Sequence, residues 1–204
     1  MPARERLLAE LRHHVADERV LEALRAVPRD RYVMPSRRAE AWENIALPIA
    51  CGQTVSQPLV VARMCELLEL RGDETVLDVG TGSGYHAAVL AGLAGHVYSI
   101  ELHAQLSATA ARALAADGIA NVTLTVGDGS GGWPAHAPYD AVNVAAAVGG
   151  ELPPPLLDQL APGGRLVAPV GDGEQRLVRV RRTVRGFERE ALESVRFVPL
   201  VSGG

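Results

Sequence analysis

The sequence predicts an α/β fold in which a doubly wound, mostly parallel sheet follows an N-terminal helical region and precedes a C-terminal antiparallel hairpin. Three observations support this prediction. Between about residues 58 and 170, short apolar runs alternate with helical stretches, as in parallel sheets covered on both faces. One run ends in three glycines at alternate positions, which is typical of a turn from a strand into a helix. The tail alternates apolar and charged residues around Arg185-Gly186, a hairpin pattern.

The size and charge of the chain favour one globular domain. With 204 residues and 48% apolar content it can bury a sizeable core, divided into N-terminal helices and a loop (1–57) and an α/β core (58–204). The net charge of −4 argues against a non-specific nucleic-acid binder, which needs a basic surface. No apolar run is long enough to cross a membrane and the N-terminus is charged, so we expect an unexported, cytoplasmic protein without membrane contact.

Missing residue types exclude several kinds of enzyme. The chain has no lysine, which removes Walker A phosphate loops, pyridoxal Schiff bases and lysine nucleophiles. It has no H-E-x-x-H and no G-x-S-x-G, the commonest zinc-hydrolase and α/β-hydrolase motifs. Cys51 and Cys65 form no C-x-x-C and have no histidine at metal spacing, so we expect reduced thiols and no metal site.

The predicted elements follow from periodicity and from Gly and Pro positions. Residues 4–26 predict two short helices interrupted near Asp17, and Pro58 begins a helix that runs to about residue 70. Between them, residues 41–57 show no clear period, and a loop of this length is usually functional. The expected strands are 75–79, 96–100, 122–126, 139–144, 165–170, 175–182 and 187–198. Of the remaining expected helices, one follows the glycine turn and ends near residue 94, one ends near residue 117, and a short one spans 156–160.

The glycine turn follows the strand that ends in Asp78 and Val79, and it predicts a nucleotide-like ligand at a helix N-terminus. Its spacing is G-x-G-x-G, whereas the nicotinamide fingerprint is G-x-G-x-x-G. Glu101, which closes the next strand, suits a ribose diol in either case. An acid at Asp78 that points into the turn repels a pyrophosphate and favours a cation, such as the amino-acid end of S-adenosylmethionine. Asp128 and Gly129 supply polar groups where an adenine amine could lie. A nicotinamide reductase and a turn without ligand remain alternatives.

Several segments together resemble the protein-L-isoaspartate O-methyltransferase family, from about Val20 to Leu200. The glycine turn alone is common to all class I methyltransferases, whereas the G-Q-T-V-S-Q-P segment at residues 52–58 is strongly specific. The matching segments are 41–49, 52–58, 76–90, 97–101, 127–129, 132–134, 137–141 and 195–200.

The resemblance implies a class I methyltransferase fold, S-adenosylmethionine as cofactor, and methylation of the free α-carboxylate of isoaspartyl residues in damaged proteins and peptides. It makes Ser56 the active-site serine, although a helix-capping hydroxyl before Pro58 also explains this serine without the family. A monomer that binds neither nucleic acid nor membrane is expected. The resemblance places three groups of residues at the cofactor: the loop residues Gln53, Thr54 and Val55, the turn residues Gly80, Thr81, Gly82, Ser83 and Gly84, and the strand-end residues Glu101, Asp128 and Gly129.

Five positions depart from the family pattern and concern substrate choice: Cys51, Leu59, Ser130, Asn143 and Ala145. Leu59, Ser130 and Ala145 motivate a second hypothesis, a relative that methylates an ordinary aspartate or another carboxylate of a dedicated peptide. A third hypothesis is a regulatory module that binds the cofactor without catalysis. None of the five departures removes a residue of the expected cofactor site.

Overall fold

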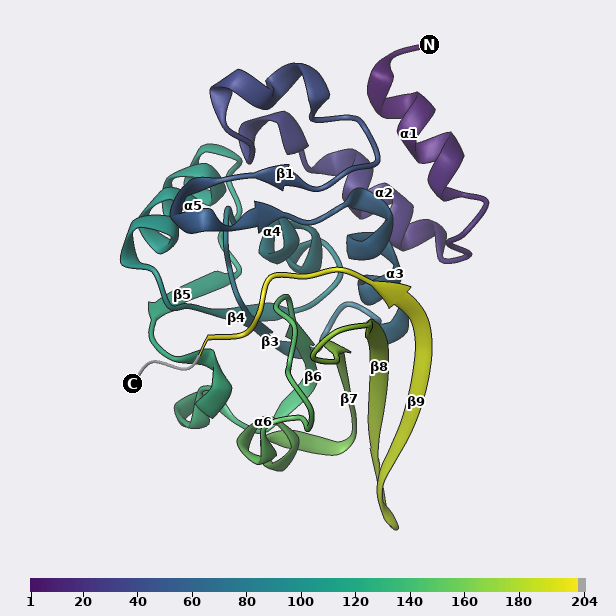
Figure 1. The fold of residues 1–204 in the computed structure, drawn as a ribbon, viewed down its shortest axis with the longest axis vertical. Helices are drawn as coiled ribbons and strands as arrows, with labels where there is room; N and C mark the ends of the chain where they lie inside the picture. The colour runs from purple at the N-terminus through teal and green to yellow at the C-terminus, as the bar shows by residue number, and fades with distance from the viewer. Residues whose placement is uncertain (202–204) are drawn as a thin grey trace.

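A seven-stranded sheet forms the centre of the computed structural model, which describes residues 1–201 (Figure 1). Residues 202–204 of the predicted domain lie outside the described part. Across the sheet the order is β5, β4, β3, β6, β7, β8, β9. The strands are β3 (Thr75–Val79), β4 (His96–Glu101), β5 (Val122–Val126), β6 (Tyr139–Val144), β7 (Leu160–Val170), β8 (Gln175–Thr183) and β9 (Gly186–Val195).

The strand order places a ligand site at the carboxyl ends of β3 and β6. The chain goes from β3 outward to β4 and β5, and then returns to the other side of β3 with β6. All pairs from β5 to β7 are parallel, whereas β8 and β9 pair antiparallel at the edge, as the sequence predicted. In such sheets ligands bind outside the carboxyl ends of the strands where the winding direction reverses.

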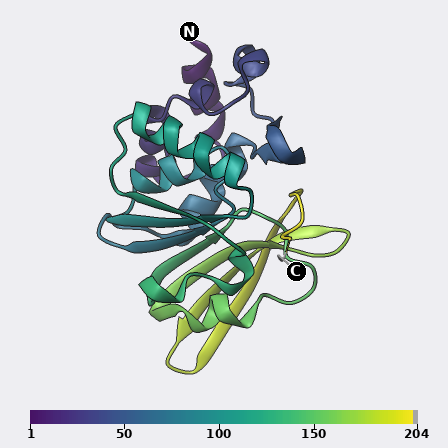
Figure 2. The same ribbon diagram turned by 90° about the vertical axis from the view of Figure 1, so that its left-hand side faces the viewer.

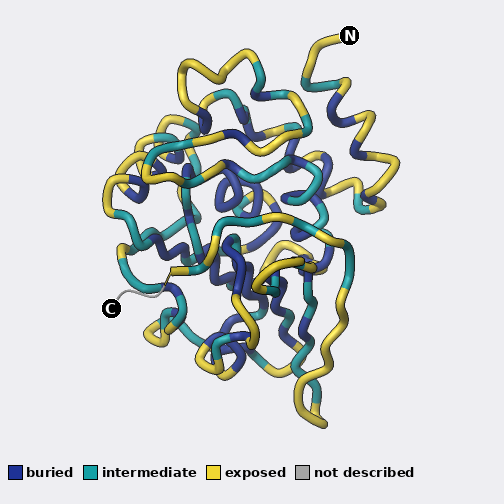
Figure 3. Tube along the Cα trace, viewed as in Figure 1, coloured by how far each residue is buried: buried dark blue, intermediate teal, exposed yellow. Residues whose placement is uncertain are grey.

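Helices cover both faces of the sheet (Figure 2). They are α1 (Ala3–Leu11), α2 (Glu18–Ala26), α3 (Pro58–Leu68), α4 (Tyr85–Ala91), α5 (Ala104–Ala116) and α6 (Pro154–Asp158). Because side chains alternate along a strand, Val76 packs with the core cluster that includes α1 to α4, whereas Leu77 and Val79 pack with the cluster of α6. The parallel strands other than β5 are mostly buried, and the tip of the edge hairpin is exposed (Figure 3).

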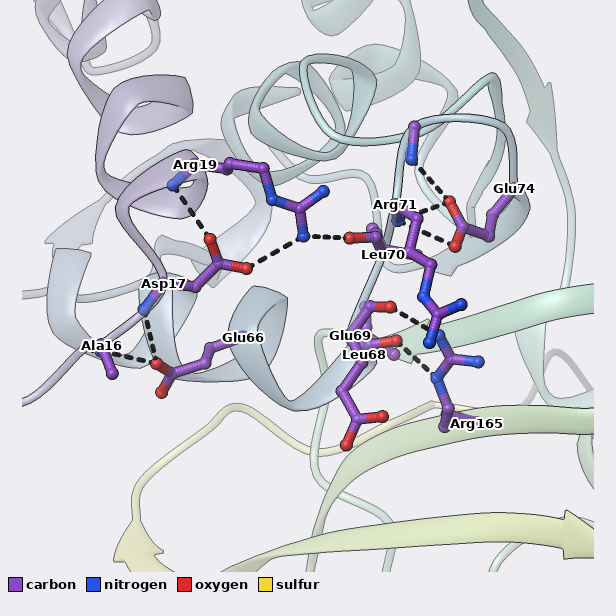
Figure 4. Close-up of polar contacts among 11 residues, drawn as sticks. Ala16, Asp17, Arg19, Glu66, Leu68, Glu69, Leu70, Arg71, Glu74 and Arg165 are labelled. Atoms are coloured by element: carbon purple, nitrogen blue, oxygen red, sulfur yellow. Dashed lines mark hydrogen bonds and ion pairs between the residues drawn. The ribbon is translucent and has the colours of Figure 1, made fainter.

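Polar contacts attach the N-terminal helices to α3 (Figure 4). The carboxylate of Glu66 accepts hydrogen bonds from the backbone N–H groups of Ala16 at 2.6 Å and Asp17 at 3.0 Å. Asp17 in turn caps α2 by accepting from the backbone N–H of Arg19 at 2.9 Å. Helix ends carry orphan N–H groups, and these carboxylates satisfy them. The predicted interruption near Asp17 is therefore a capped turn between two helices.

The expected loop at residues 41–57 contains ordered structure that the sequence did not predict. Residues Leu47–Pro48 form β1 and Thr54–Val55 form β2, an antiparallel pair joined by the 3-10 turn η3 (Ala50–Gly52). Cys51 in this turn has a φ of 58°, in the left-handed region. Further short 3-10 turns are η1 (Arg29–Arg31), η2 (Pro35–Glu40), η4 (Gly129–Gly131) and η5 (Pro134–His136).

Several element boundaries differ from the predicted ones. Helix α3 ends at Leu68, because Glu69 turns into the left-handed region with a φ of 51° and Arg165 donates to the carbonyls of Leu68 and Glu69. Helix α4 ends at Ala91, α6 begins at Pro154, and β9 ends at Val195. Within residues 1–201, no helix combines the length and the apolar character needed to cross a membrane.

Candidate active site

The glycine turn between β3 and α4 adopts a conformation that requires glycine. Gly80, Gly82 and Gly84 have φ values of 93°, 55° and 89°, which L side chains rarely adopt. At Gly84 a Cβ would also stand 3.0 Å from the Cβ of Ala110, so glycine allows α5 to pack closely. The backbone N–H of Gly80 donates to the carbonyl of Ile100 at 2.9 Å. The turn is thus fixed against the end of β4.

Glu101 at the end of β4 faces the glycine turn. One of its carboxylate oxygens accepts from the backbone N–H of Gly82 at 2.8 Å, and the other accepts from that of His103 at 2.9 Å. A carboxylate has about four lone-pair sites, so acceptor capacity remains for a ribose diol. Its two backbone bonds hold the carboxylate in place before a ligand arrives. The geometry fits the role that the sequence suggested.

The side chain of Asp78 does not point into the glycine turn, where we expected it from the sequence. Its side chain is fully buried and does not line any cavity beside the glycine turn. The carboxylate accepts from Ser99 Oγ at 2.7 Å and from Asn143 Nδ2 at 2.7 Å. Burial raises the pKa of Asp78, and these two hydrogen bonds act in the opposite direction. The expectation that Asp78 points toward a cationic ligand is therefore corrected, because the carboxylate instead supports the turn from beneath.

A buried polar chain connects Asp78 to the wall of the site. Asn143 Nδ2 also approaches His86 Nδ1 at 3.3 Å, and His86 Nε2 approaches Cys65 Sγ at 3.5 Å. Because an amide nitrogen can only donate, His86 Nδ1 accepts and Nε2 carries the proton. Burial lowers the pKa of His86 to about 3, so the imidazole is neutral. Burial also raises the pKa of the Cys65 thiol, which stays protonated.

Asp128 and Gly129 follow β5 and begin η4. Asp128 caps this turn by accepting from the backbone N–H of Ser130 at 2.8 Å. Gly129 is tightly packed: a Cβ there would lie 2.4 Å from Val79 Cγ1. The close approach of this backbone to β3 explains why glycine stands here.

Ser56 is positioned by a buried arginine that the sequence did not reveal. Arg29 has no exposed surface and lies with its guanidinium carbon 5.6 Å from the ring centre of Tyr85. It donates to the carbonyls of Ala41 at 2.6 Å, Ile45 at 2.9 Å and Ser56 at 3.1 Å. Burial lowers the pKa of Arg29. One side chain thus gathers the ends of the 41–56 segment.

Four cavities lie in succession along the carboxyl edge of the sheet, and each shares lining residues with the next; we call them together the path. The turn cavity, about 70 Å³, is lined by the glycine turn, Glu101 and Gly129. The junction cavity, about 30 Å³, shares Thr54, Gly80, Gly82 and Ala145 with it. The near groove, about 460 Å³, shares Thr54 and Ser56 with the junction cavity. The far groove, about 550 Å³, extends the near groove to the end of α1.

Most of the predicted site residues line this path. His86, which the sequence did not single out, lines the junction cavity together with Ser56. Among the five positions that depart from the family pattern, Ala145 lines both the turn and junction cavities and Leu59 lines the far groove. The other three, Cys51, Ser130 and Asn143, line none of the four cavities. The predicted residues on the path are Gln53, Thr54, Val55, Ser56, Gly80, Thr81, Gly82, Ser83, Glu101 and Gly129; Asp78, Gly84 and Asp128 are not on it.

The residues at the turn cavity fit S-adenosylmethionine better than a metal. They supply backbone groups of the turn, a fixed carboxylate at Glu101 and a close-packed backbone at Gly129. No group of three or more His, Cys, Asp or Glu side chains in the described chain is placed to hold a metal ion. The turn cavity is below the 300–1,000 Å³ typical of ligand sites. Gln53, Thr54 and residues 198–201 also line this cavity.

A larger hollow of about 900 Å³ lies at the opposite edge of the sheet. It is lined by residues that precede strands, including Gly72 before β3 and Asn121 before β5. Doubly wound folds bind ligands at the carboxyl ends of their strands. The smaller cavities around the glycine turn are therefore the candidate active site.

Known proteins resemble the chain over nearly its whole length. A curated protein-L-isoaspartate O-methyltransferase of Erwinia tasmaniensis is 50% identical over 98% of this chain and 96% of its own. That of Cronobacter sakazakii is 51% identical over 97% of this chain and 95% of its own. A solved structure titled protein-L-isoaspartate O-methyltransferase superposes with a TM-score of 0.87 at 27% identity, covering 98% of this chain and 66% of that one.

A Plasmodium falciparum structure, titled as such an enzyme in complex with S-adenosyl-L-homocysteine, has the same fold, with a TM-score of 0.85 at 23% identity over all of both chains. The family model described as protein-L-isoaspartate(D-aspartate) O-methyltransferase matches residues 2–204. The chain belongs to the protein-L-isoaspartate(D-aspartate) O-methyltransferase family.

Proposed function

We propose that this protein transfers a methyl group from S-adenosylmethionine to the free α-carboxylate of L-isoaspartyl residues in damaged proteins and peptides. The observation that carries the proposal is the position of Ser56. It lines both the junction cavity, which opens to the glycine turn, and the near groove, which leads away from it. A cofactor held at the turn and a peptide held in the groove would meet at this serine.

The cofactor contacts follow from the site geometry. Glu101 would hold the ribose hydroxyls, the backbone of Gly80 and Gly82 would line the cofactor, and Gly129 would lie beside the adenine. Asp78 acts indirectly, since its bond from Ser99 continues to Thr81, whose Oγ1 lies 2.5 Å from Ser99 Oγ. We therefore assign Asp78 to positioning of the turn. Bound here, S-adenosylmethionine supplies a methyl group on a positively charged sulfur.

The reaction requires the protein mainly to position the reacting groups and to exclude water from them. A carboxylate with a pKa near 4 is ionised at neutral pH, so no side chain has to remove a proton from it. The Ser56 hydroxyl would donate a hydrogen bond that orients the carboxylate oxygen. Thr54 and Val55 would close over the reacting groups and keep water away, which favours the loss of charge during transfer. His86 is neutral at the same cavity and adds no competing charge.

We further propose that the protein acts as a monomer in the cytoplasm, on protein rather than on nucleic acid or membrane. Both cysteines are free thiols, as expected in a reducing compartment. The net charge of −4 gives no basis for nucleic-acid binding. Light scattering of the purified protein tests the monomer.

A matched peptide pair tests the function. The two peptides share one sequence and differ only in an isoaspartyl or an aspartyl linkage at one position. Incubated with the protein and S-adenosylmethionine, the isoaspartyl peptide should gain a methyl ester and the aspartyl peptide should not. Methylation of the aspartyl peptide alone would favour the dedicated-peptide hypothesis, which Leu59, Ser130 and Ala145 motivate; of these, Ala145 lines the turn and junction cavities and Leu59 lines the far groove. Cofactor binding with no turnover would favour the regulatory module.

A further inference from the structure

The near and far grooves adjoin each other along the edge of the sheet, and we call the two together the channel. They share Gln57, Val60, Ser194 and Val195, so α3 forms one wall and the end of β9 forms the other. At one end the channel reaches Ser56, and at the other it reaches His13 and His14 after α1. An extended peptide advances about 3.3 Å per residue, so residues that flank the isoaspartyl residue would lie along this channel.

Of the two arginines that line this channel, one is paired with carboxylates and the other is not. In the far groove, Arg63 is paired with Glu66 and, at 2.8 Å, with Glu193. In the near groove, Arg196 is exposed and has no hydrogen bond or ion pair with any residue of the described chain 1–201. No Asp or Glu lines the near groove.

Exposed arginines are often simply solvated, and Arg185 and Arg189, which lie outside the channel, have no side-chain partner within residues 1–201. Four other arginines of the hairpin do have partners. Arg179 is paired with Glu69 and Glu190, and Arg181 is paired with Glu69. Arg176 and Arg182 donate to backbone carbonyls. Within the channel, the arginine without a partner is Arg196, which lines the near groove together with Ser56.

The reacting carboxylate is a poor partner for this cation. Its charge disappears as the methyl group is transferred, so a guanidinium bound to it would stabilise the bound substrate more than the transition state. A carboxylate that survives the reaction carries no such penalty. Resting on the proposed function, we propose that Arg196 binds an acidic side chain within about two residues of the isoaspartyl residue, and so gives this enzyme a preference for acidic flanking sequence.

The test uses isoaspartyl peptides that carry Glu or Gln at each of the two positions on either side of the isoaspartyl residue. For the parent protein, kcat/KM should be about 2- to 5-fold higher with Glu at one or more positions, through KM, and the preference should shrink as salt is raised. Arg196→Gln should abolish the preference, so that the ratio of kcat/KM for the Glu peptide to kcat/KM for the Gln peptide falls to about 1. Arg189→Gln, which removes one exposed arginine of the same hairpin outside the channel, should retain it.

The outcomes separate this proposal from the proposed function. Equal kcat/KM values for Glu and Gln peptides with the parent protein would overturn the role of Arg196 alone, and so would a preference that survives Arg196→Gln. Absence of turnover on every isoaspartyl peptide would overturn the proposed function and the Arg196 proposal with it.

Discussion

Asn143 Nδ2 donates a 2.7 Å hydrogen bond to Asp78 Oδ1, which joins the central strands β3 and β6 directly beneath the glycine turn. The same nitrogen lies 3.3 Å from His86 Nδ1, at the start of α4. Two strands and a helix that flank the glycine turn are thus held by one amide. Asn143, an unexpected polar residue in an aliphatic strand, is explained by this position.

Replacing Asn143 with leucine should destabilise the protein. The substitution removes a donor from two buried acceptors while keeping a similar volume, so the free energy of unfolding should fall by about 2–3 kcal/mol. Guanidinium unfolding followed by circular dichroism measures this change. Ser99→Ala, which removes the other donor to Asp78, should act in the same direction. A free energy within about 0.5 kcal/mol of the parent would mean that the buried bond contributes nothing.

His86 should make the protein sensitive to mild acid. Its pKa is lowered to about 3 in the fold, whereas an unfolded histidine titrates near 6.5. The unfolded state therefore takes up a proton first, and stability is lost as the pH falls from about 6.5 toward 3, by up to about 1.4 kcal/mol per pH unit. His86→Gln should flatten this slope.

The matched control for this titration is His14→Gln, because His14 is exposed at the end of α1. Its unfolding free energies, measured from pH 7 to pH 4, should follow the parent curve. A His86→Gln curve as steep as the parent curve would show that another group causes the acid sensitivity.

Gly129 should tolerate no side chain. An alanine Cβ would meet Val79 Cγ1 at 2.4 Å, whereas at Gly131, two residues later in η4, a Cβ meets nothing within 4 Å. Gly129→Ala should cost about 1–3 kcal/mol of stability and weaken binding of S-adenosylhomocysteine, measured by calorimetry. Gly131→Ala should leave both nearly unchanged. Equal behaviour of the two variants would contradict the packing at the end of β5.

Arg29→Lys should loosen the segment that carries Ser56. Lysine lacks the planar fork of five donors, so it cannot serve the carbonyls of Ala41, Ile45 and Ser56 together. We expect a loss of about 2–3 kcal/mol in unfolding free energy and a raised KM for isoaspartyl peptide. Arg31→Lys is the control, since Arg31 is more exposed and pairs with Asp117. If both variants keep parental KM values, Arg29 does not position the loop.

The sequence predicted the parts of the fold that depend on local patterns. Strands 122–126 and 139–144 lie at the predicted residues, because short apolar runs bounded by turn residues define them. The glycine turn was predictable for the same reason. Helix ends were less predictable: α3 stops at Leu68 because of Arg165, which is distant in sequence.

The site depended more on tertiary contacts. Arg29 bonds carbonyls 12 to 27 residues away, and nothing in its own neighbourhood in the sequence indicates burial. Our prediction of the direction in which the Asp78 side chain points was wrong. It considered only that Asp78 lies near the end of the strand, and not which face of the sheet its side chain is on. Alternation along β3 puts Asp78 on the same face as Val76, under the helices, and this signal was present in the sequence.

The most direct test of the central claim, that cofactor and substrate meet at Ser56, compares Ser56→Ala with the parent protein in two measurements. Loss of one hydrogen bond to a carboxylate should lower kcat/KM for an isoaspartyl peptide about 10- to 100-fold. The affinity for S-adenosylhomocysteine should stay within about twofold, because Ser56 lines the junction cavity and the near groove but not the turn cavity. Parental kcat/KM in Ser56→Ala would contradict the account.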